Sequence, residues 1–127
     1  MNSTQGSADS FGSLIVKVTT AQGAIPLADA SVNVRGGTKE TSGVLYSLRT
    51  NRDGQTERIT LPTPPRSNSE TPDGGIPYAL YAIDVSKDGY LPLHLEQVPI
   101  FPSILSIQPA VLIPASAREI AESEVDQ

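Results

Sequence analysis

Short stretches of alternating apolar and polar residues, separated by turns rich in glycine and proline, constrain this 127-residue chain more than any other feature. Successive side chains of a β-strand point to opposite faces, so such a stretch gives one face for a core and one for solvent. The first stretch covers residues 14–20 and the second covers residues 30–35. The side chains expected to point inward are Leu14, Val16 and Val18 in the first stretch, and Ala30, Val32 and Val34 in the second.

Further stretches with strand character follow at intervals of about ten residues. Proline cannot donate to a strand ladder, so Pro99 and Pro102 are expected to break the strand near Ile100, and Pro109 is expected to place the last strand at an edge. No internal segment has convincing helical spacing. The sequence therefore predicts an all-β, Greek-key sandwich of two sheets and roughly seven strands. The later predicted strands cover residues 44–50, 55–61, 78–87, 90–98 and 106–113.

The length fits a single domain with two flanking segments. We expect a flexible N-terminal arm over residues 1–12, the sandwich over residues 13–114, and an acidic tail or short helix over residues 115–127. Residues 62–77 contain five prolines, so no strand is expected there. A loop of this length in so small a domain is a candidate functional segment.

Composition excludes several classes of partner and site. The net charge of −5 repels phosphate backbones, so nucleic acid is not an expected partner. The chain has no cysteine, which excludes disulfides and thiolate sites. No apolar run reaches the roughly 20 residues that span a bilayer, and the N-terminus lacks a basic and apolar signal region. The compartment stays open: cytoplasmic synthesis is expected, with a spore or cell-envelope association as one alternative.

Several short motifs occur in an order that is typical of one group of sandwiches. A Gly-x-Leu-x-Val-x-Val strand comes first and a Pro-x-x-x-Ala-x-Val element follows it. Together they resemble the carboxypeptidase regulatory-like domain of the transthyretin-like (prealbumin-like) β-sandwich group, over residues 12–114. The resemblance implies the same sandwich fold. The segments that carry it are Gly12–Val18, Ile25–Val32, Thr50–Gly54, Tyr81–Tyr90 and Leu112–Pro114.

A narrower resemblance rests on the proline-containing segments. These segments are similar to the N-terminal domain of clostridial spore cortex-lytic enzymes and related peptidoglycan-binding proteins. In those proteins the domain precedes separate wall-binding or lytic modules, so the resemblance implies a non-catalytic accessory domain. This chain ends soon after the sandwich, which leaves only the accessory role. The segments are Leu61–Pro65, Pro77–Tyr81, Val98–Pro102 and Ser106–Pro109.

Catalytic and metal-binding motifs are weak in this chain. His94 is the single histidine, so a Ser–His–Asp triad or a histidine general base would depend on it. The chain has no second histidine that could bind a metal ion together with His94. Its place in an alternating strand favours an ordinary exposed or half-buried position. Residues 51–54 have a trace of a calcium loop, but the spacing of the expected glutamate is wrong and a β-turn is favoured. We expect no enzyme activity, no catalytic residues, no cofactor and no metal.

Aromatic and proline side chains are the candidate interaction residues. Aromatic rings stack on sugars or fill the pockets of protein partners, and proline-rich segments dock in an extended conformation. The first hypothesis is a domain that displays loops and sheet edges to a protein partner, for example by strand addition along residues 92–113. The alternatives are a carbohydrate (peptidoglycan)-binding module and a structural subunit of a homo-oligomeric assembly. The candidate residues are Pro64, Pro65, Tyr78, Tyr81, Tyr90 and Phe101.

Overall fold

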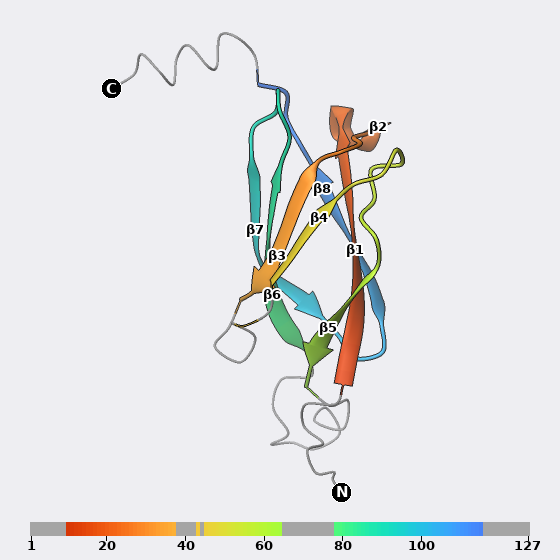
Figure 1. Cartoon of the computed structure of the whole chain (residues 1–127), viewed down its shortest axis with the longest axis vertical. Helices are drawn as coiled ribbons and strands as arrows, with labels where there is room; N and C mark the ends of the chain where they lie inside the picture. Colours follow the sequence, from red (N-terminus) through yellow and green to blue (C-terminus); the bar gives the residue numbers. More distant parts are fainter. Residues whose placement is uncertain (1–9, 38–42, 44, 65–77, 116–127) are drawn as a thin grey trace, which may run out of the picture.

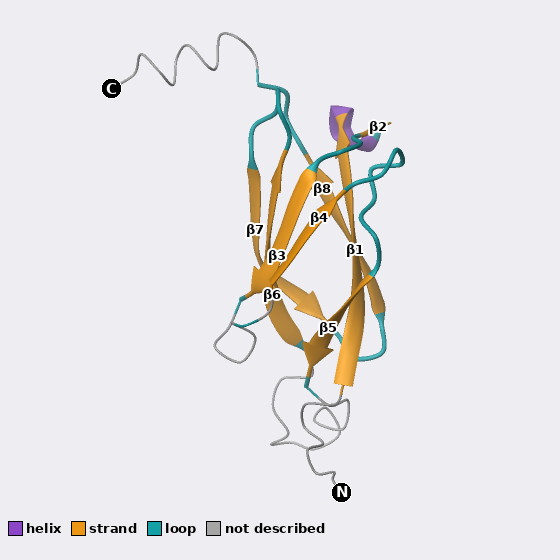
Figure 2. Cartoon of the chain, viewed as in Figure 1, coloured by secondary structure: helices purple, strands orange, loops and turns teal. Residues whose placement is uncertain are grey.

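The computed structural model describes residues 10–37, 43, 45–64 and 78–115, and strands dominate these residues (Figures 1 and 2). Two four-stranded sheets pack face to face, which confirms the predicted all-β sandwich. A short 3₁₀ turn, η2 (Ala21–Gly23), follows the first strand. The β1 sheet consists of β1 (Ser10–Thr20), β2 (Ile25–Pro26), β5 (Ile59–Thr63) and β8 (Leu105–Val111). The β3 sheet consists of β3 (Ser31–Gly36), β4 (Leu45–Arg49), β6 (Ala79–Ser86) and β7 (Leu93–Ile100).

Strand order differs between the two sheets. In the β1 sheet, β1 pairs antiparallel with β2 and β5 and parallel with β8. The β3 sheet is antiparallel throughout, in the order β4-β3-β6-β7. Its register aligns four polar residues in one row across all four strands: Ser47, Asn33, Asp84 and His94.

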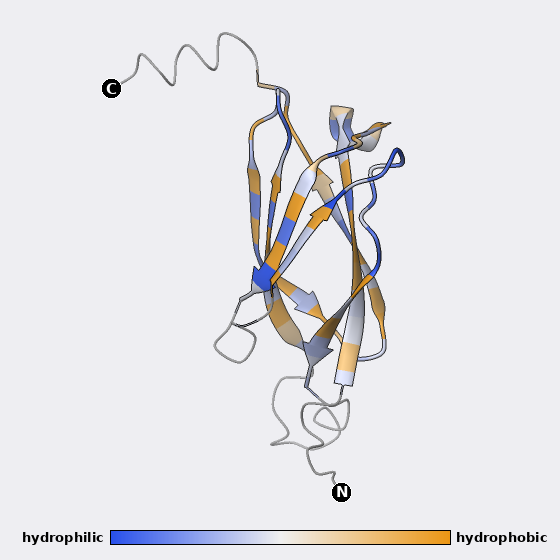
Figure 3. Cartoon of the chain, in the orientation of Figure 1, coloured by the Kyte–Doolittle hydropathy of each residue, from blue (hydrophilic) through white to orange (hydrophobic). Residues whose placement is uncertain are grey.

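The core lies between the two sheets and consists of aliphatic side chains and one tyrosine. The inward positions predicted for residues 14–20 and 30–35 are confirmed. Figure 3 shows the alternation along β3, where hydrophobic and hydrophilic residues follow one another. Burial of these side chains is the main favourable contribution to folding. The largest fully buried side chains are Tyr81, Leu14, Leu61, Ile83, Ile100, Leu112, Val16, Val18, Val32, Val34 and Val85.

Buried threonines hold the segment between β4 and β5 against the sandwich without a strand. The Thr50 hydroxyl donates to the Leu27 carbonyl at 2.6 Å and accepts from the Ala30 amide at 2.9 Å. The Thr56 hydroxyl accepts from the Val16 amide at 3.0 Å. Because a side chain here takes the place of a backbone ladder, the predicted strand over residues 55–61 is wrong in its first half, and β5 begins at Ile59.

The positions of the prolines correct two further expectations. β5 continues through Pro62 to Thr63, and β7 continues through Pro99 to Ile100. These strands tolerate proline because β7 is the edge strand of its sheet and β5 pairs with β1 alone among the described strands. β8 contains Pro109 and is an edge strand, as predicted. The first strand begins at Ser10, inside the segment expected to be an arm, while residues 65–77 and 116–127 lie outside the described residues.

Candidate functional site

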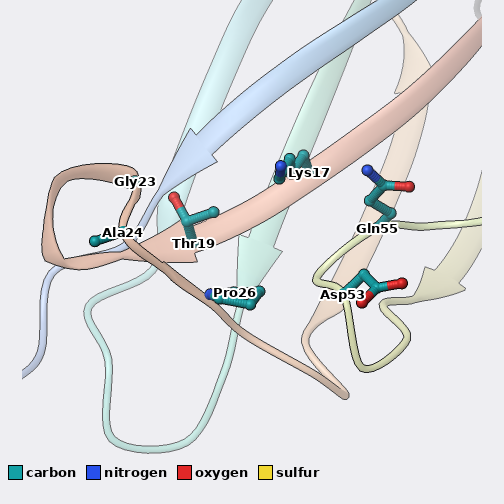
Figure 4. Close-up of a pocket in the computed structure, with 7 residues that line it drawn as sticks. All are labelled: Lys17, Thr19, Gly23, Ala24, Pro26, Asp53 and Gln55. Atoms are coloured by element: carbon teal, nitrogen blue, oxygen red, sulfur yellow. The ribbon is translucent and has the colours of Figure 1, made fainter.

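A pocket opens beside β1, near the end of the sandwich that carries β2 (Figure 4). It has a volume of about 370 Å³ and is open to solvent on one side. Lys17 and Thr19 contribute from β1, and Pro26 contributes from β2. Asp53 and Gln55 contribute from the turn before β5, which lies next to β1 because Lys17 and Gln55 form an isolated β-bridge. Gly23 and Ala24 complete the wall.

Backbone hydrogen bonds fix the turn that presents Asp53 and Gln55. The Asn51 side-chain oxygen accepts from the amides of Asp53 and Gln55, at 2.8 and 3.1 Å. This is an Asx turn, in which a side chain replaces a backbone acceptor. The Val18 amide donates to the Gly54 carbonyl at 2.6 Å and so ties the turn to β1. The frame of the pocket is therefore set by the Asn51 side chain and by the backbone bond between Gly54 and β1.

Gly54 is required for this close approach. Its φ of 79° lies in the left-handed region, and a Cβ atom there would collide with the Val18 carbonyl oxygen. The opposite wall also has unusual backbone, because Ala21 and Gln22 have φ values of 54° and 59°. Non-glycine residues in this conformation store strain, and such strain clusters at functional sites. Both walls of the pocket thus depend on left-handed residues.

The pocket combines hydrogen-bond donors, acceptors and one apolar ring. The Lys17 ammonium donates, the Asp53 carboxylate accepts, and the Gln55 amide does both. Among the described residues, neither Lys17 nor Asp53 has an ion-pair partner. The pyrrolidine ring of Pro26 adds apolar surface beside these groups (Figure 4). A small ligand with several hydroxyl groups matches such a set.

A second polar group lies on the outer face of the β3 sheet. The two ring nitrogens of His94 face two carboxylates: Nδ1 contacts Asp84 and Nε2 lies 2.7 Å from Glu96. The Arg35 guanidinium contacts the other oxygen of Asp84 at 3.1 Å. In the same row as Asp84 and His94, the Ser47 hydroxyl donates to the Asn33 side-chain oxygen at 3.0 Å. We refer to Arg35, Asp84, His94 and Glu96 as the charged cluster.

Each histidine nitrogen in the charged cluster needs a proton to donate, so both contacts are made only by the imidazolium. Hydrogen bonds to Asp84 and then to Glu96 accordingly raise the pKa of His94 above its ordinary 6.5. The hydrogen bond from His94 lowers the pKa of Asp84 below its ordinary 3.8, and Arg35 adds to that effect. With the imidazolium present, the two positive and two negative charges of the cluster cancel.

The structure separates the six candidate interaction residues. Tyr78 and Phe101 come together: their rings meet edge to face with centroids 5.3 Å apart, whereas Pro64 is half-buried just after β5. Tyr90 lies elsewhere, partly buried against the core. Pro65 falls outside the described residues. The six residues therefore do not form one surface.

Tyr81 is a correction, because its side chain is fully buried. Its hydroxyl donates to the Pro62 carbonyl at 2.6 Å and so links β6 to β5 across the core. Burial raises the pKa of Tyr81 to about 12, and the nearby Tyr46 adds to the rise. The inward alternation of residues 78–87 already indicated this position, and Tyr81 serves the core instead of a partner.

No family model matches the sequence. No curated protein matches it either. In the described residues, no helix is long and apolar enough to cross a membrane. No group of three or more histidine, aspartate or glutamate side chains in this part of the chain is arranged to hold a metal ion.

Solved structures share the fold at low sequence identity. The Bacillus anthracis TIE protein aligns with a TM-score of 0.57 and 14% identity, over 84% of this chain and 17% of that one. 3-Chlorocatechol 1,2-dioxygenase from Rhodococcus opacus 1CP aligns with a TM-score of 0.57 and 16% identity, over 90% and 63%. A Bacteroides uniformis ATCC 8492 protein that has been proposed to bind carbohydrate aligns with 0.52 and 11%, over 81% and 41%. This chain spans less than two thirds of each, and the likeness shows the sandwich fold.

These neighbours correct the expectation that the chain is not an enzyme. Several of them are catechol or hydroxyquinol 1,2-dioxygenases, at 12–16% identity. The expectation rested on the absence of a recognisable catalytic motif in the sequence, but one fold supports many chemistries at different sites. The fold of this chain is thus one that enzymes use, and identities this low establish the fold relationship without assigning an activity.

Sequence reasoning missed both the pocket and the charged cluster. The pocket joins residues about 36 positions apart in the sequence, which the Lys17–Gln55 bridge and the Val18–Gly54 hydrogen bond bring together in the folded chain. The charged cluster did leave a signal. Asp84 and His94 are equally distant from Gly89 in the turn between β6 and β7, so a hairpin centred there predicts that they pair.

Proposed function

We propose that the chain is a carbohydrate-binding module that holds a sugar residue in the pocket beside β1. The observation that carries the proposal is that Lys17 and Asp53 both line an open pocket and neither has an ion-pair partner among the described residues. Charged groups that lack intramolecular partners are available to bind ligand hydroxyls. The fold shared with a protein that has been proposed to bind carbohydrate supports the same interpretation.

The chemistry of the pocket suits a sugar better than a single ion. A sugar hydroxyl both donates and accepts, and the lining offers the ammonium of Lys17, the carboxylate of Asp53 and the amide of Gln55. The Pro26 ring can pack against the C–H face of a sugar ring. The pocket is open, so a residue within a longer glycan chain fits as well as a free sugar. Peptidoglycan is the glycan that the narrower sequence resemblance implies, and that part stays a prediction.

The test is retention of the whole chain on insoluble peptidoglycan sacculi, with cellulose and chitin as parallel matrices. Lys17→Met and Asp53→Asn should each reduce retention about tenfold, because each removes a charge-assisted hydrogen bond to the sugar. Asp88→Asn is the matched control: Asp88 is exposed and, like Asp53, precedes a glycine with positive φ in a turn. Equal retention of the two pocket variants and the wild type would refute the pocket as the site.

A second candidate function is binding of a protein partner at the other end of the sandwich. The Tyr78–Phe101 pair lies there, and Phe11 on β1 is 47% exposed. Aromatic side chains are enriched in the centres of protein interfaces. Phe101→Ala should then weaken capture of a protein partner and leave retention on glycan unchanged. Loss of glycan retention in this variant would instead place the sugar at the aromatic pair.

A further inference from the structure

The outer face of β8 is aliphatic along its whole length. Leu105, Ile107 and Val111 all point away from the core, and Ile107 is 56% exposed. Ile113 continues the row beyond the end of the strand. Together the four side chains leave on the order of 400 Å² of apolar surface in contact with water, a size that marks interaction sites on monomeric proteins. We refer to these four residues as the β8 face.

The neighbouring positions of β1 extend this surface and keep it free of negative charge. Ile15 lies beside Ile107 in the parallel register, and Lys17 lies beside Pro109. None of these positions carries a carboxylate, although the chain has a net charge of −5. Two copies of an acidic chain repel each other, but an approach through the four residues of the β8 face brings no carboxylates together, and Lys17 lies at its margin.

The free edge of β8 is blocked against strand addition. The Leu112 amide donates to Thr19 on β1 at 2.8 Å, and the Ser13 amide donates to the Ile104 carbonyl at 3.0 Å, so even-numbered residues bond to β1. In a parallel ladder the odd-numbered residues then direct their backbone groups to the free edge. There Pro109 has no N–H, and its carbonyl accepts from the Gln108 side-chain amide at 2.9 Å. A partner must therefore pack on the side chains, which also argues against strand addition by β8 as a binding mode.

We propose that a second copy of this chain packs its β8 face against the first, in a two-fold symmetric dimer. A two-fold axis places a surface against itself, so the surface must be complementary to its own rotated image. A row of similar aliphatic side chains along one strand meets that condition at every position. The β8 face supplies about half of the roughly 800 Å² that each partner contributes to a standard interface, and the polar groups beside it supply a rim.

The blocked edge also predicts that the assembly stops at two copies. A two-fold dimer covers both copies of the β8 face, so this face offers no further surface to a third chain, whereas pairing of strand edges would extend the sheet. The β8 face shares none of its four residues with the pocket, although Lys17 and Thr19 of the pocket lie beside Pro109 and Val111 of β8, so the variants of each site are tested separately for dimer formation and for retention on glycan.

The test is sedimentation velocity of the whole chain from about 1 µM to about 1 mM, since dimer formation depends on concentration. Wild type should change from monomer to dimer within this range. Ile107→Asp should raise the dissociation constant by about tenfold or more, because it buries a carboxylate in an apolar interface. Val111→Lys is the second variant, in case the first fails to fold. Leu45→Asp is the matched control, since Leu45 is 69% exposed on the other sheet.

Three results would overturn the proposal. Wild type that stays monomeric throughout the range would exclude the dimer directly. Equal weakening by Leu45→Asp and Ile107→Asp would show a general charge effect. A monomer whose retention on sacculi is lost in Ile107→Asp would assign the β8 face to glycan instead of a second copy, and the Lys17 and Asp53 variants would then decide separately whether the pocket binds sugar.

Discussion

The outer faces of the two sheets differ sharply, although apolar and polar residues alternate in the same way along the strands of both sheets. The β3 sheet presents the charged cluster, whose members contact one another across three strands. The β1 sheet presents the aliphatic β8 face and the pocket, where Lys17 and Asp53 have no ion-pair partner among the described residues. One face has thus satisfied its polar groups internally, and the other has groups available for a ligand or partner. Binding is therefore expected on the β1 sheet.

The largest loss of stability is expected at Gly54, where the turn beside the pocket packs against the backbone of β1. Gly54→Ala places a Cβ against the Val18 carbonyl and forces a left-handed alanine, so it should lower the free energy of unfolding by about 3 kcal/mol. Gly23→Ala is the control: its φ is 97°, but no atom lies within 4 Å of an added Cβ. That change should cost about 1 kcal/mol. Urea unfolding measures both, and equal losses would contradict the close-approach argument.

The next largest change in stability is expected at Tyr81, whose hydroxyl joins the two sheets through its hydrogen bond to the Pro62 carbonyl. Its pKa is about 12 in the folded chain and near 10 when unfolded, so the unfolded chain loses this proton first as the pH rises. Stability should be complete below pH 10 and fall by about 2 kcal/mol as the pH approaches 12. Tyr81→Phe should lack this fall when unfolding is measured across the same pH range. An unchanged alkaline profile in the variant would place the titration elsewhere.

A smaller loss of stability is expected from substitutions in the charged cluster, because its side chains are exposed to solvent. Arg35→Gln removes the contact with Asp84 and should lower the free energy of unfolding by less than about 1 kcal/mol. The loss should shrink further at high salt, which screens exposed charges. Urea unfolding at low and high ionic strength measures it. A loss of several kcal/mol would mean that this face contributes to the stability of the sandwich far more than its exposure indicates.

The smallest change is a pKa shift at His94, which is the single histidine and so gives one resolved imidazole signal by NMR. Asp84→Asn should lower the pKa of His94 toward 6.5, and Glu96→Gln should lower it less, following the order of their contributions. The contacts of the imidazolium are complete below pH 6.5 and are lost as the pH rises through the elevated pKa. A pKa of 6.5 in the wild type would contradict the contacts with the two carboxylates.

Local alternation was sufficient to predict the sandwich and the inward side chains of β1 and β3. It failed where one side chain replaces a ladder, as at Thr56, and where an edge strand tolerates proline, as at Pro62 and Pro99. The pocket was not predictable, because its walls meet only in the folded chain, through non-local contacts such as the Val18–Gly54 hydrogen bond and the Lys17–Gln55 bridge. The aromatic residues were expected to form the binding surface, but Tyr81 is in the core and Tyr90 packs on it.

The most direct test of carbohydrate binding at the β1 sheet is a titration of the ¹⁵N-labelled whole chain with soluble peptidoglycan fragments, followed by amide chemical shifts. We expect saturable amide shifts at Lys17, Thr19, Asp53 and Gln55 that are lost in Asp53→Asn and kept in Asp88→Asn. Shifts confined to the charged cluster, or to Tyr78 and Phe101, would contradict carbohydrate binding at the pocket.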